Sequence, residues 1–600
     1  MCGFAGKVSL GHRPDFDTVQ RMTRRLSHRG PDAEGVKNID NNAVFGHRRL
    51  AIIDLSETAN QPMQDISGRY TIVYNGEVYN YRELRKVLES AGIRFQTNSD
   101  TEVVLYSYIM WKEECFEKFN GMFALAIWDS RNKILTLARD RFGKKPLFYT
   151  QLNSEITFAS EMSAILMDES IKEKSSLSVA AMNHYFAIGY ILAPLTIYDE
   201  IYKLEPATYI AFGELNIKKH RYWDYRACFD FQTKQQEDEI AEQLDALLEK
   251  AVKYRLISDV PVGAFLSGGL DSSGVSAYAR KLIPYELHTF SVGFAEGTYN
   301  ESQDAQLISE YLGTIHHELI PDLKGDEETI VNAIDCYDEP FSDSSLIPMV
   351  LISRFASKFV KVVLSGDGAD EIFGGYLTYR ADNIKNKLNF FPKPVLQLAS
   401  KVIRKTAVES VKKTSLGFKL KQFSRGLGQN ACYAHYAWRE LHDEKERISL
   451  IGAEHSEEIM ASHPFLTFSK FYEEARELST MNQHLYVDVK TWLADDILAK
   501  VDRGTMAFGL EARCPFLDAE LTAYAASIPP SMKIGINSGK NILKKVLKKY
   551  LPLPTIHKKK SGFNAPVNIW LNNRKENEYR YFNKYVWKAK WPSLKNFHLT

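Results

Sequence analysis

The first 210 residues alternate short apolar runs with turn-forming residues, which is the pattern of a strand-rich domain. Two stretches with apolar residues at three- and four-residue spacing, 81–92 and 100–119, interrupt these runs and predict helices. Strands on both sides of helices favour an α+β layered sandwich, and we place this domain at 2–215. The expected strands are 43–55, 69–80, 121–129, 133–140, 146–150, 155–160 and 208–213.

Beyond residue 240 the pattern changes to buried strands that alternate with helices. This alternation is typical of parallel strands joined by helical crossovers, so we expect an α/β doubly wound parallel sheet. The chain after about residue 380 has an almost entirely helical pattern, which predicts a helical C-terminal part within a second domain at 235–600. The polar segment 223–239 is expected to connect the domains. The strands expected in the second domain are 260–267, 287–294, 315–320 and 361–366.

The composition excludes several classes of protein. A chain of 600 residues with 44% hydrophobic and 25% charged residues is that of an ordinary multi-domain globular protein. The net charge of +1 argues against a nucleic-acid partner, and the apolar runs are too short for membrane insertion. The six cysteines have no C-x-x-C spacing, and no basic segment followed by an apolar one opens the chain. We therefore expect a cytoplasmic protein.

The heptapeptide SGGLDSS, 267–273, lies between a predicted strand and a predicted helix. Glycines allow a ligand to approach the backbone closely, and the free N–H groups of a helix start attract anions. Asp271 would repel a bare phosphate, so it implies an intervening cation such as Mg²⁺. A flexible turn is the alternative, but the string resembles the pyrophosphate loop of enzymes that cleave ATP between the α and β phosphates. The expected ATP-binding residues are Ser267, Gly268, Gly269, Asp271, Ser272 and Ser273.

A second predicted strand, 361–366, leads into the acidic turn SGDGADE. Turns at the carboxyl ends of neighbouring parallel strands open onto one crevice, so this turn is expected to face the first. An exposed acidic loop is the alternative. Ser365 and Gly366 are expected beside ATP. The carboxyl groups of Asp367, Asp370 and Glu371 could hold Mg²⁺ or accept a proton.

Cys2 stands beside the initiator methionine in MCGFAG. Removal of Met1 would free an α-amine that titrates near ~8 and can serve as a base for the thiol of the same residue. Nucleophile and base would then share one residue. On these six residues alone an incidental cysteine is the simpler interpretation, so the hypothesis depends on the rest of the chain.

Four further motifs lie within the first 102 residues, namely HRGPDAEG, GHRRLAIIDL, YNGEVYNY and TNSDTE. Together with Cys2 they resemble the class II glutamine amidotransferase domain, an N-terminal-nucleophile fold in which the cysteine hydrolyses glutamine. The resemblance makes Cys2 the nucleophile and assigns the oxyanion hole to the side-chain amide of Asn75 and the N–H of Gly76. The other residues that it implies bind glutamine: Arg49 at the α-carboxylate, and Glu77 and Asp100 at the α-ammonium group.

Joined to SGGLDSS, the set resembles the glutamine-hydrolysing asparagine synthetase family over nearly the whole chain, except about the last 25 residues. This resemblance implies that Asp271 and Asp370 bind Mg²⁺ and that Lys540 neutralises charge during adenylation. Asp367 stands where many members carry glutamate in S-G-E-G, which leaves its role as a proton acceptor open. Two later stretches, 492–518 and 558–570, also resemble family segments, and packing between domains is an equal explanation for them.

The expected reaction has two halves. Glutamine is hydrolysed at Cys2, and ATP activates a carboxylate as an acyl-adenylate that the released ammonia converts to an amide. Aspartate is the expected acceptor, and segment 336–349 is expected to border its pocket. A sugar uronic acid in surface-polysaccharide synthesis, or a catalytically silent regulatory homologue, are the alternatives. The partners are therefore small molecules, with ATP as a substrate, Mg²⁺ as the cofactor and a homodimer as one possible assembly.

Overall fold

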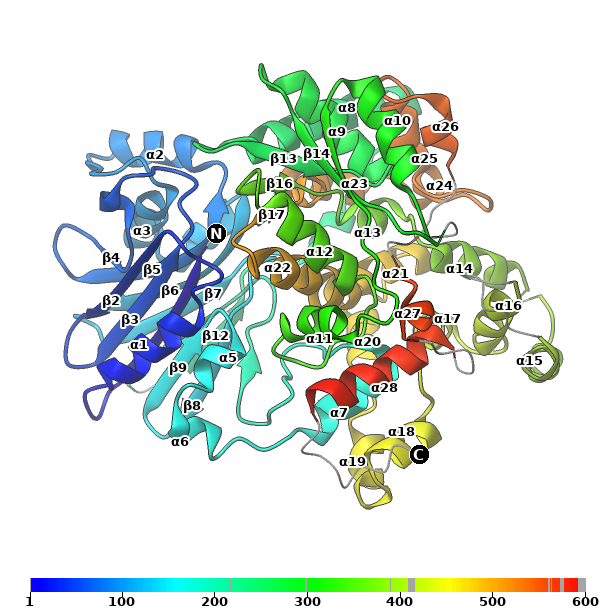
Figure 1. Ribbon diagram of the computed structural model, residues 1–600, viewed down its shortest axis with the longest axis horizontal. Coiled ribbons are helices and arrows are strands. Elements are labelled where there is room, and N and C mark those ends of the chain that lie inside the picture. The colour runs from blue at the N-terminus through cyan, green and yellow to red at the C-terminus, as the bar shows by residue number, and fades with distance from the viewer. Residues whose placement is uncertain are drawn as a thin grey trace.

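The computed structural model describes residues 2–214, 217–296, 299–388, 390–407, 416–558, 562, 564–571 and 577–591. Two sheets fill the N-terminal half, drawn in blue and cyan, and helices surround a smaller sheet in the C-terminal half (Figure 1). The two halves lie directly against each other. No helix in these described ranges is both long and apolar enough to cross a bilayer.

Two antiparallel six-stranded sheets form the first domain. Phe4, Val73 and Trp128, from strands of both sheets, share one apolar cluster, so the sheets pack face to face. Helices cover the outer faces, which confirms the predicted α+β layered sandwich (Figure 1). The first sheet has the order β10 (Tyr202–Lys203), β8 (Phe148–Leu152), β9 (Glu155–Ala159), β1 (Gly3–Ser9), β3 (Ala43–Arg49), β2 (Ala33–Asn38). The second has the order β12 (Ile217–Arg221), β11 (Thr208–Phe212), β7 (Ile134–Arg139), β6 (Gly121–Asp129), β5 (Tyr70–Val78), β4 (Met63–Gln64).

The helices of this domain differ from the prediction at one point. The predicted helix 81–92 is α2 (Tyr81–Ser90), but the helix predicted over 100–119 breaks after α3 (Asp100–Trp111). Lys112 has a φ of 51°, a left-handed conformation that ends the helix, and its ammonium group donates to the hydroxyl of Tyr70 at 2.6 Å. The remaining helices are α1 (Phe16–Arg25), α4 (Cys115–Lys118), α5 (Met162–Ile165), α6 (Glu169–Lys172) and α7 (Val179–Ile188).

The second domain contains a parallel sheet of five strands, which confirms the predicted doubly wound arrangement. Its order is β15 (Ile315–Leu319), β14 (His288–Val292), β13 (Val262–Phe265), β16 (Val362–Leu364), β17 (Glu511–Arg513). The fifth strand, β17, was not predicted; it has three residues and lies within the C-terminal part, which is otherwise mostly helical as expected. Helices α8 (Glu237–Arg255), α9 (Leu270–Leu282), α10 (Ser302–Leu312) and α12 (Leu346–Ala356) surround this sheet, and α11 (Glu327–Asp335) packs on α12 away from it (Figure 1).

The C-terminal part is helical (Figure 1). Its longer helices include α14 (Leu377–Leu388), α17 (Ala431–Ala437), α21 (Thr480–Asp488), α22 (Leu498–Met506), α23 (Ala519–Ser527) and α28 (Glu578–Lys590), and the short α13 (Ala369–Phe373) and α25 (Asn541–Leu547) lie near the parallel sheet.

The connection between the domains is packed rather than loose. Strand β12 extends past residue 215, where we expected the first domain to end, and a short 3-10 helix, Tyr225–Phe229, follows. The rings of Tyr225 and Phe229 are buried, and the N–H of Thr233 donates to the carbonyl of Ser527 at 3.0 Å. The segment 223–239 therefore fixes the first domain against α23 of the second.

Candidate active sites

Cys2 directly precedes β1, in the middle of the first sheet, and its side chain is buried. Its backbone N–H donates to Oδ1 of Asn75, on β5 of the facing sheet, at 3.0 Å. The Nδ2 group of Asn75 is buried and has no hydrogen-bond partner in the described part of the chain. A free donor beside a thiol is what an oxyanion hole requires. Burial raises the pKa of the Cys2 thiol, so the thiol needs a base before it can attack.

Gly76, the other predicted oxyanion residue, follows Asn75 on β5. A side chain there would begin 2.2 Å from the carbonyl oxygen of Met122 and 2.7 Å from the Cα of Phe123, on the neighbouring strand β6. The close approach of these two backbones therefore leaves room for glycine alone.

Arg49 ends β3 and is held by oxygen atoms of the loop that follows it. Its guanidinium group donates to the carbonyl of Ser56 at 2.7 Å, to Oδ1 of Asn60 at 2.8 Å and to the carbonyl of Asp54. Among the described residues no carboxylate pairs with it, so its charge is oriented but not neutralised. Such a guanidinium group can pair with a ligand carboxylate.

Glu77 and Asp100 are two buried carboxyl groups at the end of β5 and the start of α3. Asp100 accepts from the hydroxyl of Tyr74 at 2.8 Å and from the N–H of Val78 at 3.0 Å. Burial raises the pKa of Asp100 to about 6 and the pKa of Glu77 well above its usual range. Two buried carboxylates disfavour each other's charge, so a cationic ligand group between them would be attracted strongly.

The second domain also contacts the predicted glutamine site, which no motif indicated. Arg513, on β17, lies with its guanidinium nitrogen 3.6 Å from Oε1 of Glu77 and donates to Oε1 of Glu511 at 2.5 Å. Its other amino group donates to the carbonyls of Arg255 and Ile257 at 2.8 and 2.6 Å. The strand that the sequence analysis missed therefore places a buried cation against a residue of the predicted glutamine site.

Arg29 makes a second connection between the domains. Its Nε donates to the carbonyl of Cys2 at 3.2 Å, and its two amino groups pair with Glu161 at 2.8 Å and with Asp502, on α22, at 2.8 Å. The side chain is fully buried. Arg29 lies in the motif HRGPDAEG, but the role of each residue in that motif was not predicted.

In the second domain, the turn SGGLDSS connects β13 to α9. Gly268 has a φ of 66°, and a side chain there would begin 2.6 Å from Cβ of Asp304, so the turn requires glycine. Gly269 is the N-terminal cap of α9, and no side chain satisfies the free N–H groups there. The hydroxyls of Ser267 and Ser272 lie 3.1 Å apart. The hydroxyl of Ser273 is buried and has no partner within the described ranges.

The acidic turn after β16 lies against this first turn. A side chain at Gly366 would begin 2.8 Å from the backbone nitrogen of Ser272 and 2.9 Å from Cβ of Asp271, so the two loops touch. Ser365 donates its hydroxyl to Asp367, and the N–H of Asp367 donates back to that hydroxyl at 3.2 Å. The parallel topology thus brings the two predicted turns to one edge of the sheet. Nearby, burial raises the pKa of Glu371 to about 8.

Asp271 and Asp370, the predicted metal ligands, converge on one cation. The ammonium nitrogen of Lys540 lies 2.5 Å from a carboxylate oxygen of each. Asp271 keeps a second buried oxygen that has no partner among the residues described. Two carboxylates that share a cation fit a divalent metal ion such as Mg²⁺. Gly375 completes the arrangement, because a side chain there would begin 1.8 Å from Oδ1 of Asp370 and 2.2 Å from Cε of Lys540.

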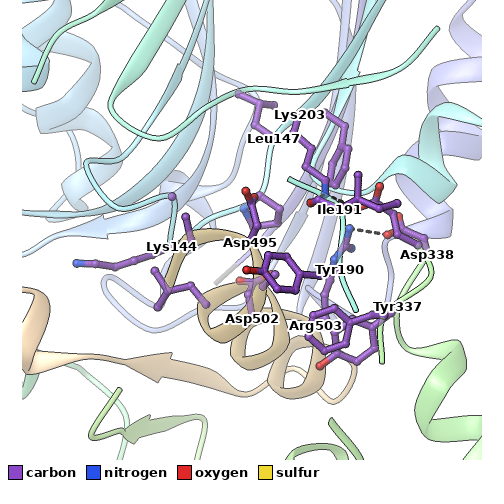
Figure 2. Close-up of a pocket in the computed structure, with 18 of the residues that line it drawn as sticks. Lys144, Leu147, Tyr190, Ile191, Lys203, Tyr337, Asp338, Asp495, Asp502 and Arg503 are labelled. Atoms are coloured by element: carbon purple, nitrogen blue, oxygen red, sulfur yellow. Dashed lines mark hydrogen bonds and ion pairs between the residues drawn. The ribbon is translucent and has the colours of Figure 1, made fainter. Parts of the chain in front are cut away.

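Two cavities lie between the domains. Figure 2 shows the larger one, which lies between α22, with Asp502 and Arg503, and the first domain, with Leu147 and Lys203; Arg503 pairs with Asp338 at 2.7 Å. Residues 337–341, from the segment expected to border the acceptor pocket, form part of its wall. The smaller cavity is lined by Met122, Lys144, Lys145, Leu498, Val501, Asp502, Ala512 and Cys514.

Comparisons with known proteins agree with this two-site arrangement. A family model described as asparagine synthase matches residues 243–583, and one described as a glutamine amidotransferase domain matches residues 1–223. Asparagine synthetase (glutamine-hydrolyzing) 1 of Bacillus subtilis is 33% identical over 96% of this chain and 88% of its own length. Asparagine synthetase (glutamine-hydrolyzing) 3 of the same organism is 33% identical over 94% and 87%, and amidase chry2 of Gibberella zeae is 29% identical over 91% and 84%.

These matches define the class of the protein as an ATP-dependent amidoligase that takes its amide nitrogen from glutamine. Each matched domain contains one of the two sites described above. The chain belongs to the asparagine synthase family.

Proposed function

We propose that the first site hydrolyses glutamine at Cys2. Loss of Met1 frees the α-amine of Cys2, which takes the thiol proton, and the thiolate attacks the side-chain amide carbon. The unpartnered amide of Asn75 and the N–H of Gly76 then bind the developing oxyanion. The tetrahedral intermediate collapses as the C–N bond breaks, the nitrogen takes the proton held by the α-amine and leaves as ammonia, and water then hydrolyses the thioester to glutamate and the free thiol.

Recognition of glutamine follows from the charges around Cys2. We assign the substrate's α-carboxylate to the unneutralised guanidinium of Arg49. Its α-ammonium group goes to the buried carboxyls of Glu77 and Asp100, whose raised pKa values a bound cation would lower.

The second site is proposed to adenylate a carboxylate. The carboxylate oxygen attacks the α-phosphorus of ATP, the bond to the β-phosphate breaks, and pyrophosphate leaves. This activation is needed because the oxide of a free carboxylate is a very poor leaving group. The turn 267–273 holds the phosphates with its N–H groups and hydroxyls. Asp271 and Asp370 would hold Mg²⁺, which neutralises phosphate charge, and Lys540 would turn its ammonium group toward the phosphates. Ammonia attacks the acyl-adenylate, and AMP leaves with the bonding electrons.

Ammonia must travel between the sites as the neutral molecule, since its protonated form is not nucleophilic. We propose that it passes through the smaller cavity between the domains. Met122 of that cavity pairs with Glu77 across β5 and β6, beside the proposed oxyanion hole. Ala512 and Cys514 also line this cavity. Between them, Arg513 accepts a hydrogen bond at its carbonyl from the N–H of Ser365, in the acidic turn of the second site, at 2.8 Å. The cavity thus has one end near each site.

Aspartate is the acceptor that we propose, which makes the product asparagine. The observation that carries this choice is the match to asparagine synthetases along nearly the whole chain. The amidase-named relative favours a second candidate, in which the same chemistry acts on another carboxylate. Pyrophosphate release, measured with ATP, Mg²⁺, glutamine and one candidate acid at a time, separates them. Release with aspartate supports asparagine synthesis, release only with a uronic-acid sugar reverses the choice, and release with none of the acids favours the catalytically silent homologue.

The raised pKa of Asp100 predicts how glutamine hydrolysis depends on pH. Asp100 must be ionised to bind the α-ammonium group, and its pKa of about 6 means that it becomes protonated below that pH. We expect kcat/KM for glutamine to fall about tenfold per pH unit below the pKa of Asp100. Ammonia-dependent synthesis does not use Asp100 and should not show this fall. A glutaminase pH profile checks the prediction. Asp100→Asn should remove the fall in kcat/KM near pH 6. If the pH profile of that variant still fell at the same pH as the wild type, the assignment would be contradicted.

Replacing Gly375 with alanine is expected to damage the second site alone. The new Cβ would displace Asp370 or Lys540, and a misplacement of this size costs about 100-fold in rate. Pyrophosphate release should therefore fall by about two orders of magnitude, and glutaminase activity should stay unchanged. Gly535→Ala is the matched control, because the atom nearest to its Cβ would be the end of the Asn541 side chain, at 3.2 Å, and the next would be the carbonyl of Ser538 at an ordinary contact distance of 3.5 Å. Equal losses in both variants would show that the effect is not specific to the carboxylate pair.

A further inference from the structure

Three helices of the C-terminal part enclose a polar cluster that neither reaction uses. Asp382 lies on α14, His435 on α17 and His484 on α21. All three side chains are buried, with exposed fractions of 1%, 0% and 1%. One ligand atom from each, a histidine ring nitrogen or a carboxylate oxygen, lies within 4.8 Å of the other two.

Both imidazole rings direct a nitrogen at the same carboxylate. Nδ1 of His435 lies 2.7 Å from Oδ2 of Asp382, and Nε2 of His484 lies 3.4 Å from Oδ1. The rings are stacked with centroids 4.4 Å apart and an interplanar angle of 10°, so metal binding would require one ring to rotate out of the stack until both nitrogens point at one ion. Ligands at about 2.0–2.2 Å from a shared metal ion lie about 3–3.5 Å from one another, and these separations are similar. Nε2 of His484 has no hydrogen-bond partner in the described ranges, although it is buried and faces Asp382.

The outer nitrogen of each ring is already held in place. Nε2 of His435 lies 3.0 Å from Oδ1 of Asp488, and Nδ1 of His484 lies 2.8 Å from the hydroxyl of Tyr472. Asp488 is fixed in turn, because the hydroxyl of Tyr379 donates to it at 2.6 Å. Metal-binding histidines usually have such a partner at the second nitrogen, which sets the tautomer and turns the other nitrogen toward the metal.

From this geometry we propose a metal site formed by Asp382, His435 and His484, which takes Zn²⁺ or a similar first-row divalent ion. Two imidazole nitrogens and one carboxylate suit zinc better than Mg²⁺ or Ca²⁺, which prefer oxygen ligands. A water molecule or the second oxygen of Asp382 would complete the coordination shell. The site is distinct from the Asp271 and Asp370 pair and does not depend on the proposed function.

The metal would join helices that are far apart in the sequence. Helix α14 begins just after Gly375 and Tyr376, and the hydroxyl of Tyr376 donates to Glu371 of the acidic turn at 2.6 Å. A metal at Asp382 would fix α14 to α17 and α21, and so would hold the helix that follows the ATP site. Its role would be structural, as in other closed metal sites.

Zinc content of the full-length protein is the first test. The chain is stripped with a chelator, incubated with Zn²⁺ alone and dialysed, and the metal is measured by mass spectrometry. We expect tightly held zinc and a higher melting temperature in the wild type, and loss of one equivalent of zinc and of the temperature shift in His484→Gln and Asp382→Asn. The matched control is His317→Gln, because His317 also stacks on a histidine, His288, but the pair has no carboxylate between its rings. Zinc held equally by all variants would overturn the proposal.

A measurement on the wild type keeps the test decisive if a variant fails to fold. X-ray absorption of the zinc-loaded protein should show two imidazole ligands, and Co²⁺ substitution should give visible bands of nitrogen-bound cobalt. Oxygen-only coordination would place the metal at Asp271 and Asp370 and contradict the proposal. Absence of retained metal would leave His435 as a proton-sharing partner of Asp382 and Asp488, and would equally overturn it.

Discussion

A Cys2→Ala variant is expected to lose glutamine-dependent amide formation and to keep ammonia-dependent amide formation. In hydrolases with a covalent intermediate, loss of the nucleophile lowers kcat on the order of 10⁶-fold, so glutaminase activity should fall to background. Added ammonium chloride supplies the nitrogen without Cys2, and the second site lies on a different sheet. Amide formation is measured with each nitrogen source in turn, alongside glutamate release.

Cys228→Ala is the matched control for this result. Cys228 is another free cysteine, partly buried in the connection between the domains and outside both sites. It should retain both activities. If Cys2→Ala removed ammonia-dependent and glutamine-dependent synthesis to the same extent, two separable sites would no longer describe the protein.

The opposite pattern is expected for Asp271→Asn. Asp271 is one of the two carboxylates that converge on Lys540, and the neutral amide would leave the Lys540 and Asp370 pair without the second negative charge. Pyrophosphate release should fall by about 10²–10³-fold, since removal of one preorganised charge contact costs about 2.7–4 kcal/mol in such sites. Glutamine hydrolysis should continue, because Cys2, Asn75 and Gly76 all lie in the first domain.

The control here is Asp304→Asn. Asp304 also lies beside the turn 267–273, but its carboxylate pairs with Lys558 and is half exposed. This variant should keep pyrophosphate release within a few fold. A loss of glutaminase activity in Asp271→Asn, or an Asp304→Asn variant as inactive as Asp271→Asn, would contradict the assigned role.

Local patterns were sufficient for most of the fold. Strands such as β5 and β6 contain continuous apolar runs whose burial follows from composition, and these were predicted near their observed positions. Strand β1, GFAGKVS, was missed because its glycines weaken the strand signal. Strand β17 has only three residues, two of them charged, and is stabilised by its position beside β16 and by the ion pair of Arg513 with Glu511.

The residues of the candidate sites also fall into two groups, those within contiguous motifs and those positioned by the packing of distant segments. Cys2, Asn75 and the turn 267–273 lie in contiguous motifs, so they could be predicted as site residues from the sequence alone. Arg29 and Arg513 gain their positions from the packing of one domain on the other, which no local pattern contains. The cluster of Asp382, His435 and His484 has no motif at all, because its members come from three helices that meet only in the folded chain.

The contacts of Arg29 have a consequence for attempts to engineer this protein. Its charge is divided between Glu161 on its own side and Asp502 on the other, while its Nε donates to the carbonyl of Cys2, the proposed nucleophile. A glutaminase half excised by itself would lose one of the two carboxylates that neutralise Arg29 and would expose to water the face that Asp502 covers. A chimaera with a foreign synthetase half should therefore keep a carboxylate at the position of Asp502. The interface between the halves helps to position Cys2, because Arg29 contacts both Asp502 and the carbonyl of Cys2.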